Sequence, residues 1–346
     1  MIDLLDLQVY IKHHPFGNTR IKEFENDSES KEKQFSKTVK LNPGGSPTYA
    51  TSLDDGNSVS IRCSPMKALQ GHNVFGSNDV CAIASAIICG TLDRLKIEYS
   101  KGQRGAWSAG DFTIRAIDLT HSFCLPDGLT SFDICRHLLR TSPVKLCRPQ
   151  WLDQGIGVRI RTSNAGSEWV VYDKSRELID KRTKASSYLK AVVGSDANNL
   201  WPLLLEIAES TIRAELKLSK TYLKRHHLTD GRTWTPKRAQ QVYLSELESL
   251  RMDAPISLNR AVSRVQSKPL QITLLLWSVG HDLQDILPKS TFNAHRKEIK
   301  SQADIDIAKH TPAAHSLKVS KVFCRENVHL LPDKHGFGAA AFLPTD

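Results

Sequence analysis

Hydrophobic and polar residues alternate over several short stretches of the chain, and such alternation predicts β-strands. The clearest case is 111–123, DFTIRAIDLTHSF. Its apolar side chains fall on both faces of the strand, with Phe112, Ile114 and Ala116 on one and Ile117, Leu119 and Phe123 on the other. This distribution predicts a central strand that is covered on both sides. The same alternation predicts further strands at 3–11, 59–63, 97–99, 158–161, 169–173 and 212–218.

Apolar residues at helical spacing predict helices between these strands, at 80–95, where Asn78 and Asp79 can cap the helix, and at 131–139, 176–188 and 203–207. The strands at 97–99 and 112–123 are expected to pair across a glycine-rich turn. Those at 158–161 and 169–173 are expected to pair around the turn sequence SNAGS. Because short hairpin connections outnumber crossovers, we expect an α+β fold with a mostly antiparallel central sheet and flanking helices.

Two regions do not fit this pattern. Residues 13–57 are polar and interrupted by proline and glycine, so we expect them to be partly loop or insertion, above all the charged run NDSESKEKQFSK. Residues 312–346 are loosely patterned and are assigned no structure. The predicted domains are therefore a main domain at 1–265, a helical segment at 266–311 and a loosely structured tail at 312–346.

The segment 266–311 has the pattern of a helix-turn-helix. An apolar helix over 270–279 is followed by a short helix, the turn LPKS with Ser290 placed as a cap, and the helix TFNAHRKEI. A second helix with exposed polar and basic residues is typical of a DNA reader, and those residues here are Asn293, His295, Arg296 and Lys297. A simple helical hairpin is the alternative, since such hairpins are common.

Composition narrows the class of protein. The chain has 346 residues, of which 40% are hydrophobic, enough for a large domain with an appendage or for two domains. No apolar run approaches the roughly 20 residues of a membrane span, and no secretory signal is visible, so we expect a cytoplasmic protein without a membrane partner. The seven cysteines show no C-x-x-C spacing, which argues against a disulfide framework or a structural zinc site.

Charge points to a polyanionic partner. The net charge of +10 and a pI near 9.2 favour nucleic acid, although a generically basic protein is the alternative. The chain lacks the phosphate-binding loop of nucleotide hydrolases, the H-E-x-x-H motif and the G-x-S-x-G motif. It also lacks a His-hydrophobe-His pair.

A set of spread polar residues can support metal-assisted chemistry. It comprises Asp118, His121, Tyr172, Lys174, Glu177 and Glu215. Carboxylates with a histidine suit Mg²⁺ or Mn²⁺, and a tyrosine beside such an ion and a lysine can attack a phosphodiester. The alternatives are structural: Asp118 paired with Arg115 or capping a turn, and Tyr172 packing on the sheet. The polar loop 70–73 can place His72 near a metal or DNA, or satisfy its own backbone.

Five stretches, in order, resemble the replication initiator family of filamentous phages, the gene II/X type, which has plasmid rolling-circle relatives. They are SPMKALQGHNVFGSND, IRAIDLTHSF, EWVVYDKSREL, IRAELKLSKTYLKRHHL and the tail segment LPKSTFNAHRKEIKSQADIDI, which together lie between about 59 and 307. The resemblance implies a metal-dependent nicking and closing enzyme. Such an enzyme nicks one strand of a double-stranded origin, leaves a 3′-OH for host polymerase, works with a host helicase and recircularises the displaced strand.

The resemblance also implies roles for individual residues. Asp118 is the first expected ligand of Mg²⁺ or Mn²⁺; the other candidates are His121, Glu177, Glu215 and His72. Strand parity places His121 across the sheet from Asp118, so joint ligation requires a bulge, or else His121 contacts DNA. Tyr172 is the expected nucleophile, with Tyr188 as its rival, and Lys174 the expected phosphate contact.

DNA contacts are expected from Arg213 and Lys217 and from the polar residues of the second tail helix. Two other functions fit the same residues. One is a sequence-specific DNA-binding regulator without catalysis, and the other is a mobilisation relaxase.

Overall fold

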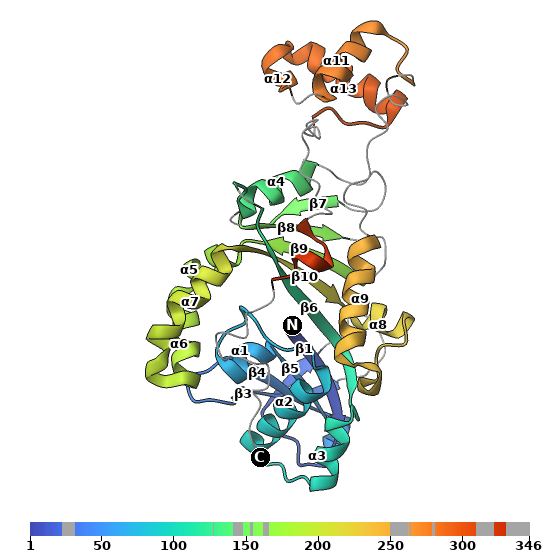
Figure 1. Ribbon diagram of the computed structural model, residues 1–346. Helices are drawn as coiled ribbons and strands as arrows, with labels where there is room; N and C mark the ends of the chain where they lie inside the picture. Colours follow the sequence, from blue (N-terminus) through green and yellow to red (C-terminus); the bar gives the residue numbers. More distant parts are fainter. Residues whose placement is uncertain are drawn as a thin grey trace.

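One antiparallel sheet organises the chain. The computed structural model describes residues 1–22, 32–126, 128–140, 148–152, 155–161, 166–249, 262, 264–278, 281–308 and 322–329. The sheet has ten strands in the order β2-β3-β4-β5-β1-β6-β10-β9-β8-β7, and the paired strands are antiparallel (Figure 1). Helices flank it, which confirms the predicted α+β class.

Strand β6 (Thr113–Cys124) lies at the centre of this sheet, as its pattern predicted. It pairs with β1 (Ile2–Tyr10) on one side and with β10 (Thr211–Leu218) on the other. The predicted strand at 97–99 is wrong, because both edges of β6 are already occupied. Ser100 and Gln103 instead form a capping box that starts helix α3 (Lys101–Ser108).

The hairpin around SNAGS is confirmed as a pair of antiparallel strands, β8 (Gly157–Arg161) and β9 (Ser167–Tyr172), and the short strand β7 (Arg148–Trp151) extends the sheet beside β8. Residues 162–165 of its turn lie outside the described part of the chain. Strand β9 also pairs with β10, so the two sequence motifs WVVYDKSREL and IRAELKL become neighbours.

Residues 13–57, expected to be partly loop or insertion, contain three strands that the hydrophobic pattern missed. Within the charged run at 26–37, residues 32–37 lie in a strand and 26–31 lie outside the described part of the chain. This region contributes β2 (Asn18–Lys22), β3 (Glu32–Lys40) and β4 (Pro47–Leu53), which lie beside β5 (Ser58–Cys63). The buried positions of β4 are Thr48, Ala50 and Ser52. Small and polar residues can fill the inner face of an outer strand, so the hydrophobic pattern that predicts strands is weak here.

Helices cover the two faces of the sheet. They are α1 (Pro65–Gln70), α2 (Val80–Leu95), α4 (Ser131–Arg140), α5 (Lys174–Asp180), α6 (Arg182–Val193), α7 (Ala197–Glu209), α8 (Lys220–Arg225) and α9 (Pro236–Ser249). Asp79 caps α2 by accepting a hydrogen bond from the backbone of Ala82. Helices α8 and α9 lie on one side of β6 and α5–α7 on the other (Figure 1).

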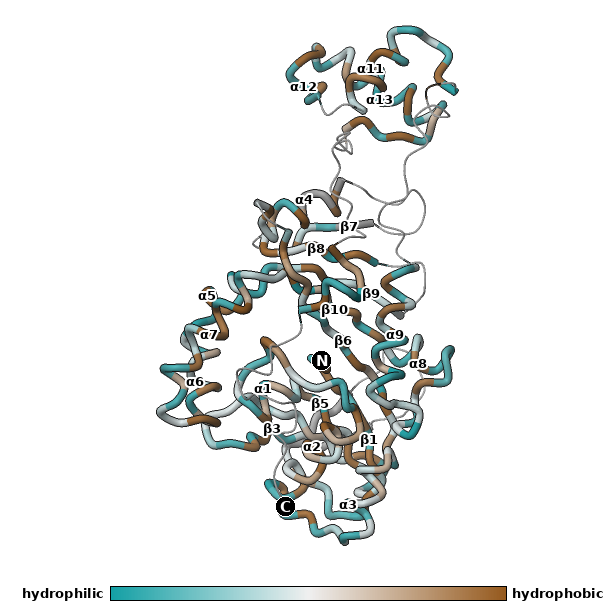
Figure 2. Tube along the Cα trace, in the orientation of Figure 1, coloured by the Kyte–Doolittle hydropathy of each residue, from teal (hydrophilic) through white to brown (hydrophobic). Residues whose placement is uncertain are grey.

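Helices α5–α7 carry a small core of their own. Brown and teal segments alternate along them in Figure 2, the pattern of helices with one apolar side. Their buried residues meet the loop that follows α1, through Val74, Leu178, Leu189 and Leu204.

The C-terminal helices form a third core. They are α11 (Lys268–Ser278), α12 (Leu283–Ile286) and α13 (Lys289–Ala303), and they bury Leu274, Trp277 and Ile299 among others. This confirms a helical segment. The expected cap at Ser290 is wrong, because α13 begins at Lys289, two residues before the predicted start, and Pro288 holds the cap position.

Part of the region predicted to be loosely structured packs on the main domain. In residues 322–329, Val322 and Phe323 are buried and the Phe323 ring lies 5.1 Å from that of Phe123. Asn327 donates a hydrogen bond to the carbonyl of Cys124, and Val328 forms a bridge with Phe123. Among the described helices, none has the length and apolar character that crossing a membrane requires.

Replacement of Phe323 tests whether this return of the chain stabilises the fold. We expect Phe323→Ala to cost about 3 kcal/mol of unfolding free energy, because it removes a buried ring from the main core. Urea denaturation followed by circular dichroism measures this. Phe132→Ala is the matched control, since Phe132 is 52% exposed, and should cost less than about 1 kcal/mol. Equal losses in both variants would show that residues 322–329 add no specific stability.

Candidate active site

Two carboxylates and a lysine meet on the central strands. The register of β6 and β10 sets Asp118 opposite Lys217 and Thr120 opposite Glu215, so Asp118, Lys217 and Glu215 share one face of the sheet. The Lys217 ammonium lies 3.0 Å from Glu215 Oε1 and 3.7 Å from Asp118 Oδ2. Both carboxylates are buried, whereas the Lys217 side chain is 40% exposed.

Burial and mutual repulsion disfavour the ionised carboxylates. Burial, and then the charge of Glu215, raises the pKa of Asp118 well above its usual value. Burial, and then the charge of Asp3, raises the pKa of Glu215. Burial alone lowers the pKa of Lys217, but Glu215 and Asp118 more than offset it, so that the Lys217 pKa is raised. A pair of buried acids with one ammonium therefore favours a further positive charge nearby.

Asp3 is a residue that the sequence interpretation missed. It lies at a bulge in β1, between the paired residues Ile2 and Leu4, and accepts a hydrogen bond of 2.5 Å from Asn73 Nδ2. The sequence did contain a sign of its role, since Asp3 is an acid within the largely apolar start of β1. The alternating pattern hid it, because a bulge changes which face a residue occupies.

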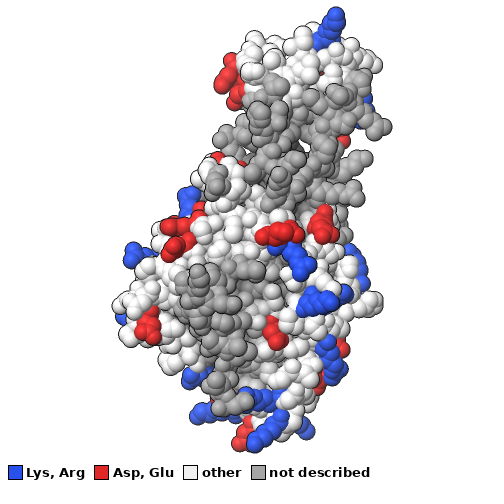
Figure 3. Space-filling model, viewed as in Figure 1, with Lys and Arg blue, Asp and Glu red and all other residues white. Residues whose placement is uncertain are grey.

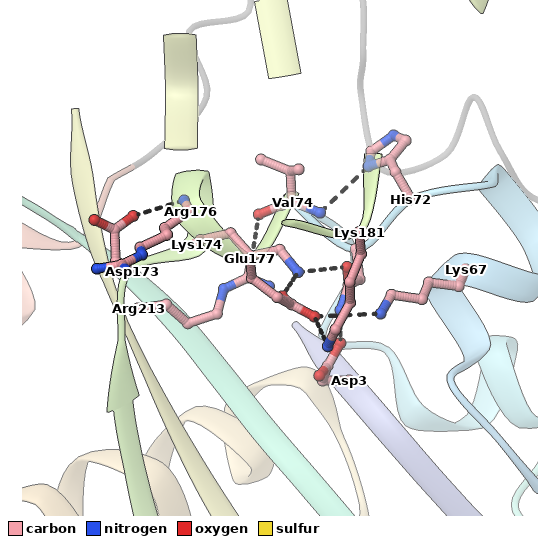
Figure 4. Close-up of polar contacts among 11 residues, drawn as sticks. Asp3, Lys67, His72, Val74, Asp173, Lys174, Arg176, Glu177, Lys181 and Arg213 are labelled. Carbon is pink, nitrogen blue, oxygen red and sulfur yellow. Dashed lines mark hydrogen bonds and ion pairs between the residues drawn. The ribbon is translucent and has the colours of Figure 1, made fainter. Parts of the chain in front are cut away.

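A lysine cluster on α1, α5 and the start of α6 surrounds Glu177 (Figure 4). Lys174 Nζ donates to Glu177 Oε2 at 2.5 Å and to Asn73 Oδ1 at 2.8 Å. Lys181 Nζ lies 3.1 Å and Lys67 Nζ 4.0 Å from Glu177 Oε1. Burial raises the pKa of Glu177, but these lysines outweigh it and hold the pKa far below its usual range. Glu177, expected as a candidate metal ligand, is thus held in ion pairs with lysines in this structure.

Lys174 itself is almost completely buried. Burial, followed by the charge of Arg213, lowers its pKa to about 8. Its ammonium is fixed between Asn73 and Glu177, so a direct phosphate contact by Lys174 requires local opening of this cluster.

Tyr172 and Arg213 form the next cross-strand pair of the same face. Arg213 is completely buried, and its Nη2 donates to the carbonyl of Val74 at 2.5 Å. A DNA contact by Arg213 therefore requires local opening, as for Lys174. Tyr172 is 7% exposed; burial raises the pKa of its phenol well above the usual value, and the Arg213 charge acts in the opposite direction.

Tyr188, the rival nucleophile, has a different environment. It lies on α6, is half-buried and carries the Lys184 ammonium 5.9 Å from its ring centre. Tyr172 thus lies among the acids but is covered, whereas Tyr188 is accessible on another element.

The two candidate histidines are separated from the acid pair. His121 lies on the other face of β6, its ring 4.4 Å from that of Tyr243 on α9, and burial holds its pKa well below the usual value. His121 therefore faces away from Asp118, as the odd spacing of three residues along the strand predicts. His72 is buried beside Phe75, and burial, then the Lys174 charge, lowers its pKa to about 3. Of the predicted metal ligands, the structure brings together Asp118 and Glu215.

The polar residues of the C-terminal helices divide into two groups. Arg296 makes a bidentate pair with Asp306, at 2.6 and 2.9 Å, and lowers the Asp306 pKa. His295 shares a hydrogen bond of 2.8 Å with Thr273. These two residues are half-buried, whereas Asn293 and Lys297 are exposed as predicted.

Comparisons with a family model and with individual proteins point to the same family. A family model that describes the N-terminal part of a phage replication-associated protein, the gene II product, matches residues 1–237. The replication-associated protein of this type from Enterobacteria phage I2-2 is 23% identical over 246 residues, which are 70% of this chain and 68% of that protein. The corresponding proteins of Enterobacteria phages fd and M13 are 29% identical over 174 residues, covering 48% of this chain but only 40% of each relative. No solved structure matches significantly.

Neutralising Asp118 should stabilise the protein in the absence of added metal. The pKa of Asp118 is raised on folding, so its contribution is most favourable below the unfolded value and is lost as the pH rises from about 4 toward the folded pKa. We expect Asp118→Asn to gain roughly 1 kcal/mol over the wild type at neutral pH and almost nothing at acid pH. Thermal melting across this pH range measures the difference, and a variant less stable than wild type at neutral pH would show that Lys217 fully compensates the charge.

Two neighbouring cations of α13 should behave differently. Arg296→Ala should lower the melting temperature of the C-terminal helices, because it leaves Asp306 without its bidentate partner. Lys297→Ala should leave that temperature unchanged. If α13 lies on DNA, Lys297→Ala also lowers the slope of log affinity against log salt by about 0.9. An unchanged slope would remove Lys297 from the DNA interface.

Proposed function

Because the chain belongs to the family of phage gene II replication-associated proteins, we propose that it starts rolling-circle replication of a phage or plasmid genome by nicking one strand of a double-stranded origin and later closing the displaced strand. The carrying observation is that the matched region 1–237 contains the sheet face with Asp118, Glu215 and Tyr172. The alignments span 68% and 40% of these relatives, so the activity of the whole relatives is a proposal for this chain.

The acid pair fits a hard divalent ion. Mg²⁺ usually keeps several waters and is held by one or two carboxylates together with substrate phosphates, so Asp118 and Glu215 supply a sufficient oxygen set, with Asp3 adding negative charge nearby. Within the described residues, no group of three or more histidine, cysteine and acidic side chains has the arrangement of a complete metal site. An ion bound there supplies positive charge that polarises a phosphodiester.

Tyr172 is the proposed nucleophile. Its phenolic oxygen loses its proton and forms the bond to phosphorus, the bond from phosphorus to the 3′-oxygen breaks, and that oxygen takes up a proton and leaves as the 3′-OH. Arg213 lies directly across the strand pair and its charge favours the phenolate. Closing is the reverse reaction, in which a 3′-OH attacks the phosphotyrosine. No ATP is consumed, because the covalent bond preserves the energy of the phosphodiester.

The proposed partners are the origin duplex, the displaced single strand, and the host helicase and polymerase. The net charge of +10 supports binding of DNA, where phosphate contacts dominate affinity. On the face shown in Figure 3, lysine and arginine side chains are spread over the domain and interspersed with acids. On that face the positive charge is not gathered in one patch, and the proposed local contacts are those of Lys217, Asn293 and Lys297.

A DNA-binding regulator without catalysis is the second candidate. The low exposure of Tyr172 favours it, because a covered phenol cannot reach a phosphate without a local rearrangement. Binding of origin DNA without nicking, in the presence of either Mg²⁺ or Mn²⁺, would decide for this regulator.

Nicking of a supercoiled plasmid that carries the origin of the encoding genome tests the enzyme. We expect nicked circles with Mg²⁺ or Mn²⁺, and a loss of about a thousandfold or more in Tyr172→Phe and in Asp118→Ala. Tyr188→Phe is the matched control and should retain most activity. Mass spectrometry of the trapped adduct locates the linked tyrosine, and an adduct on Tyr188 would transfer the role to that residue.

The metal site has a test that does not depend on activity. Mg²⁺ or Mn²⁺ should raise the melting temperature of the wild type, because the ion neutralises buried carboxylates in the folded state only. The same addition should have little effect on Asp118→Asn. Equal shifts in both proteins would show that the ion binds elsewhere.

A further inference from the structure

A pocket of about 310 Å³ lies beside the acid face and is not explained by the nicking chemistry. Strands β4 and β5, helix α1 with the loop after it, and helices α5–α7 form its walls. It touches the lysine cluster around Glu177 but extends away from it to Tyr188 on α6. Its size is at the lower end of the range for small-molecule sites.

The polar lining of this pocket is strongly basic. Five cations line it against one carboxylate, that of Glu177: Arg62, Lys67, Lys174, Lys181 and Lys184. Glu177 is already shared by three lysine ammonium groups, so it offsets only part of their charge. Lys184 adds positive charge beyond that cluster, whereas Arg62 shares its charge with Asp6, 3.7 Å away. An anion such as a phosphate group is the ligand that this balance favours.

The remaining lining is apolar and aromatic. Leu178, Leu189 and Leu204 contribute apolar surface, and the aromatic side chains of Tyr49, Tyr188 and Trp201 are part of the same wall. A pocket for phosphate alone does not need such surface. Aromatic side chains beside lysines are the combination by which proteins bind single-stranded nucleic acid, with stacking on the bases and ionic contacts to the backbone.

Two buried polar atoms at this pocket have no hydrogen-bond partner within the described part of the protein. They are His72 Nε2 and Ser64 Oγ, and both residues line the pocket. Buried polar atoms are normally satisfied, so an unsatisfied pair at a pocket indicates a polar ligand or water.

We propose that this pocket binds one unpaired nucleotide of the DNA strand that the protein nicks, with the base against Tyr188 and Trp201 and a phosphate near Lys67 and Lys184. The inference rests on the proposed function, since it names a nucleotide subsite next to that active face. It assigns α6 and α7 a role in holding the single strand, whereas β6, β9 and β10 carry the chemistry.

Binding of a fluorescein-labelled oligothymidine of roughly ten nucleotides, measured by anisotropy over a salt series, tests the pocket. Lys184→Gln removes a pocket cation, and Lys190→Gln removes an exposed cation of the same helix outside the pocket. We expect Lys184→Gln to lower the slope of log affinity against log salt by about 0.7, and Lys190→Gln to leave it unchanged. Equal effects of the two substitutions would overturn the proposal.

Stacking is tested at the aromatic wall. Tyr188→Ala should weaken binding of the oligothymidine roughly tenfold, whereas Tyr188→Phe should keep it, because the ring and not the hydroxyl makes the contact. An oligonucleotide of the same length without bases should bind the wild type as weakly as oligothymidine binds Tyr188→Ala. Binding of the abasic strand at full affinity, or its displacement by inorganic phosphate as readily as by a strand, would show a phosphate site only and overturn the nucleotide assignment.

The nicking assay separates this inference from the proposed function. Circular dichroism melting first confirms that each variant is folded. If the wild type nicks the origin but Lys184→Gln and Tyr188→Ala bind the oligothymidine like the wild type, the nucleotide pocket is wrong and the enzyme stands. If the pocket substitutions weaken binding of the oligothymidine but the wild type never nicks the origin, the nucleotide pocket is supported and the proposed nicking activity is wrong.

Discussion

Two buried carboxylates on adjacent central strands impose the main constraint on this structure. Asp118 and Glu215 occupy a face on which burial opposes their ionisation, and Lys217 lies between them without removing that cost. A sheet centre filled with aliphatic side chains would be more stable. The strands that carry this pair also carry Tyr172 and Arg213, so the unfavourable charges and the proposed chemistry share one surface. The fold holds them there because β6 is paired on both edges, and a shift of its register by one residue would move Asp118 to the opposite face of the sheet.

The lysine cluster around Glu177 connects that face to the helices. Asn73, from the loop after α1, accepts from Lys174 and donates to Asp3, so one amide joins the acid side of the sheet to the basic side of α5. The arrangement places Asp3, Asp118 and Glu215 on the strands a short distance from the lysines that surround Glu177. Under the proposed function, a DNA strand that crosses this region would meet cations for its phosphates beside the carboxylates proposed to hold a divalent ion.

The local pattern of hydrophobic, polar and capping residues predicted those elements whose formation depends on residues close in sequence. The strand at 111–123, the hairpin around SNAGS and the capped helix after Asp79 are specified by neighbouring residues, and the structure confirms them. The failures share another cause. The strands at 18–22, 32–40 and 47–53 gain their stability from pairing with β5 and with one another rather than from their own hydrophobic residues. Residues 322–329 pack through contacts with Phe123 and Cys124, about 200 positions earlier in the chain, which no local pattern reports.

For the candidate site, too, some features follow from the sequence and others only from the tertiary structure. The sequence by itself determined which residue types are present, that Asp118 and His121 face opposite sides of a strand, and that the chain resembles a family of replication initiators. These depend on strand geometry and on motif order. Only the tertiary structure decided that Glu215 joins Asp118, that Glu177 is taken up by lysines, that Arg213 and Arg296 are used within the protein, and that Asp3 belongs to the acid face. Each of these depends on which strands and helices become neighbours, since charge, burial and pKa are set by contacts between residues distant in sequence.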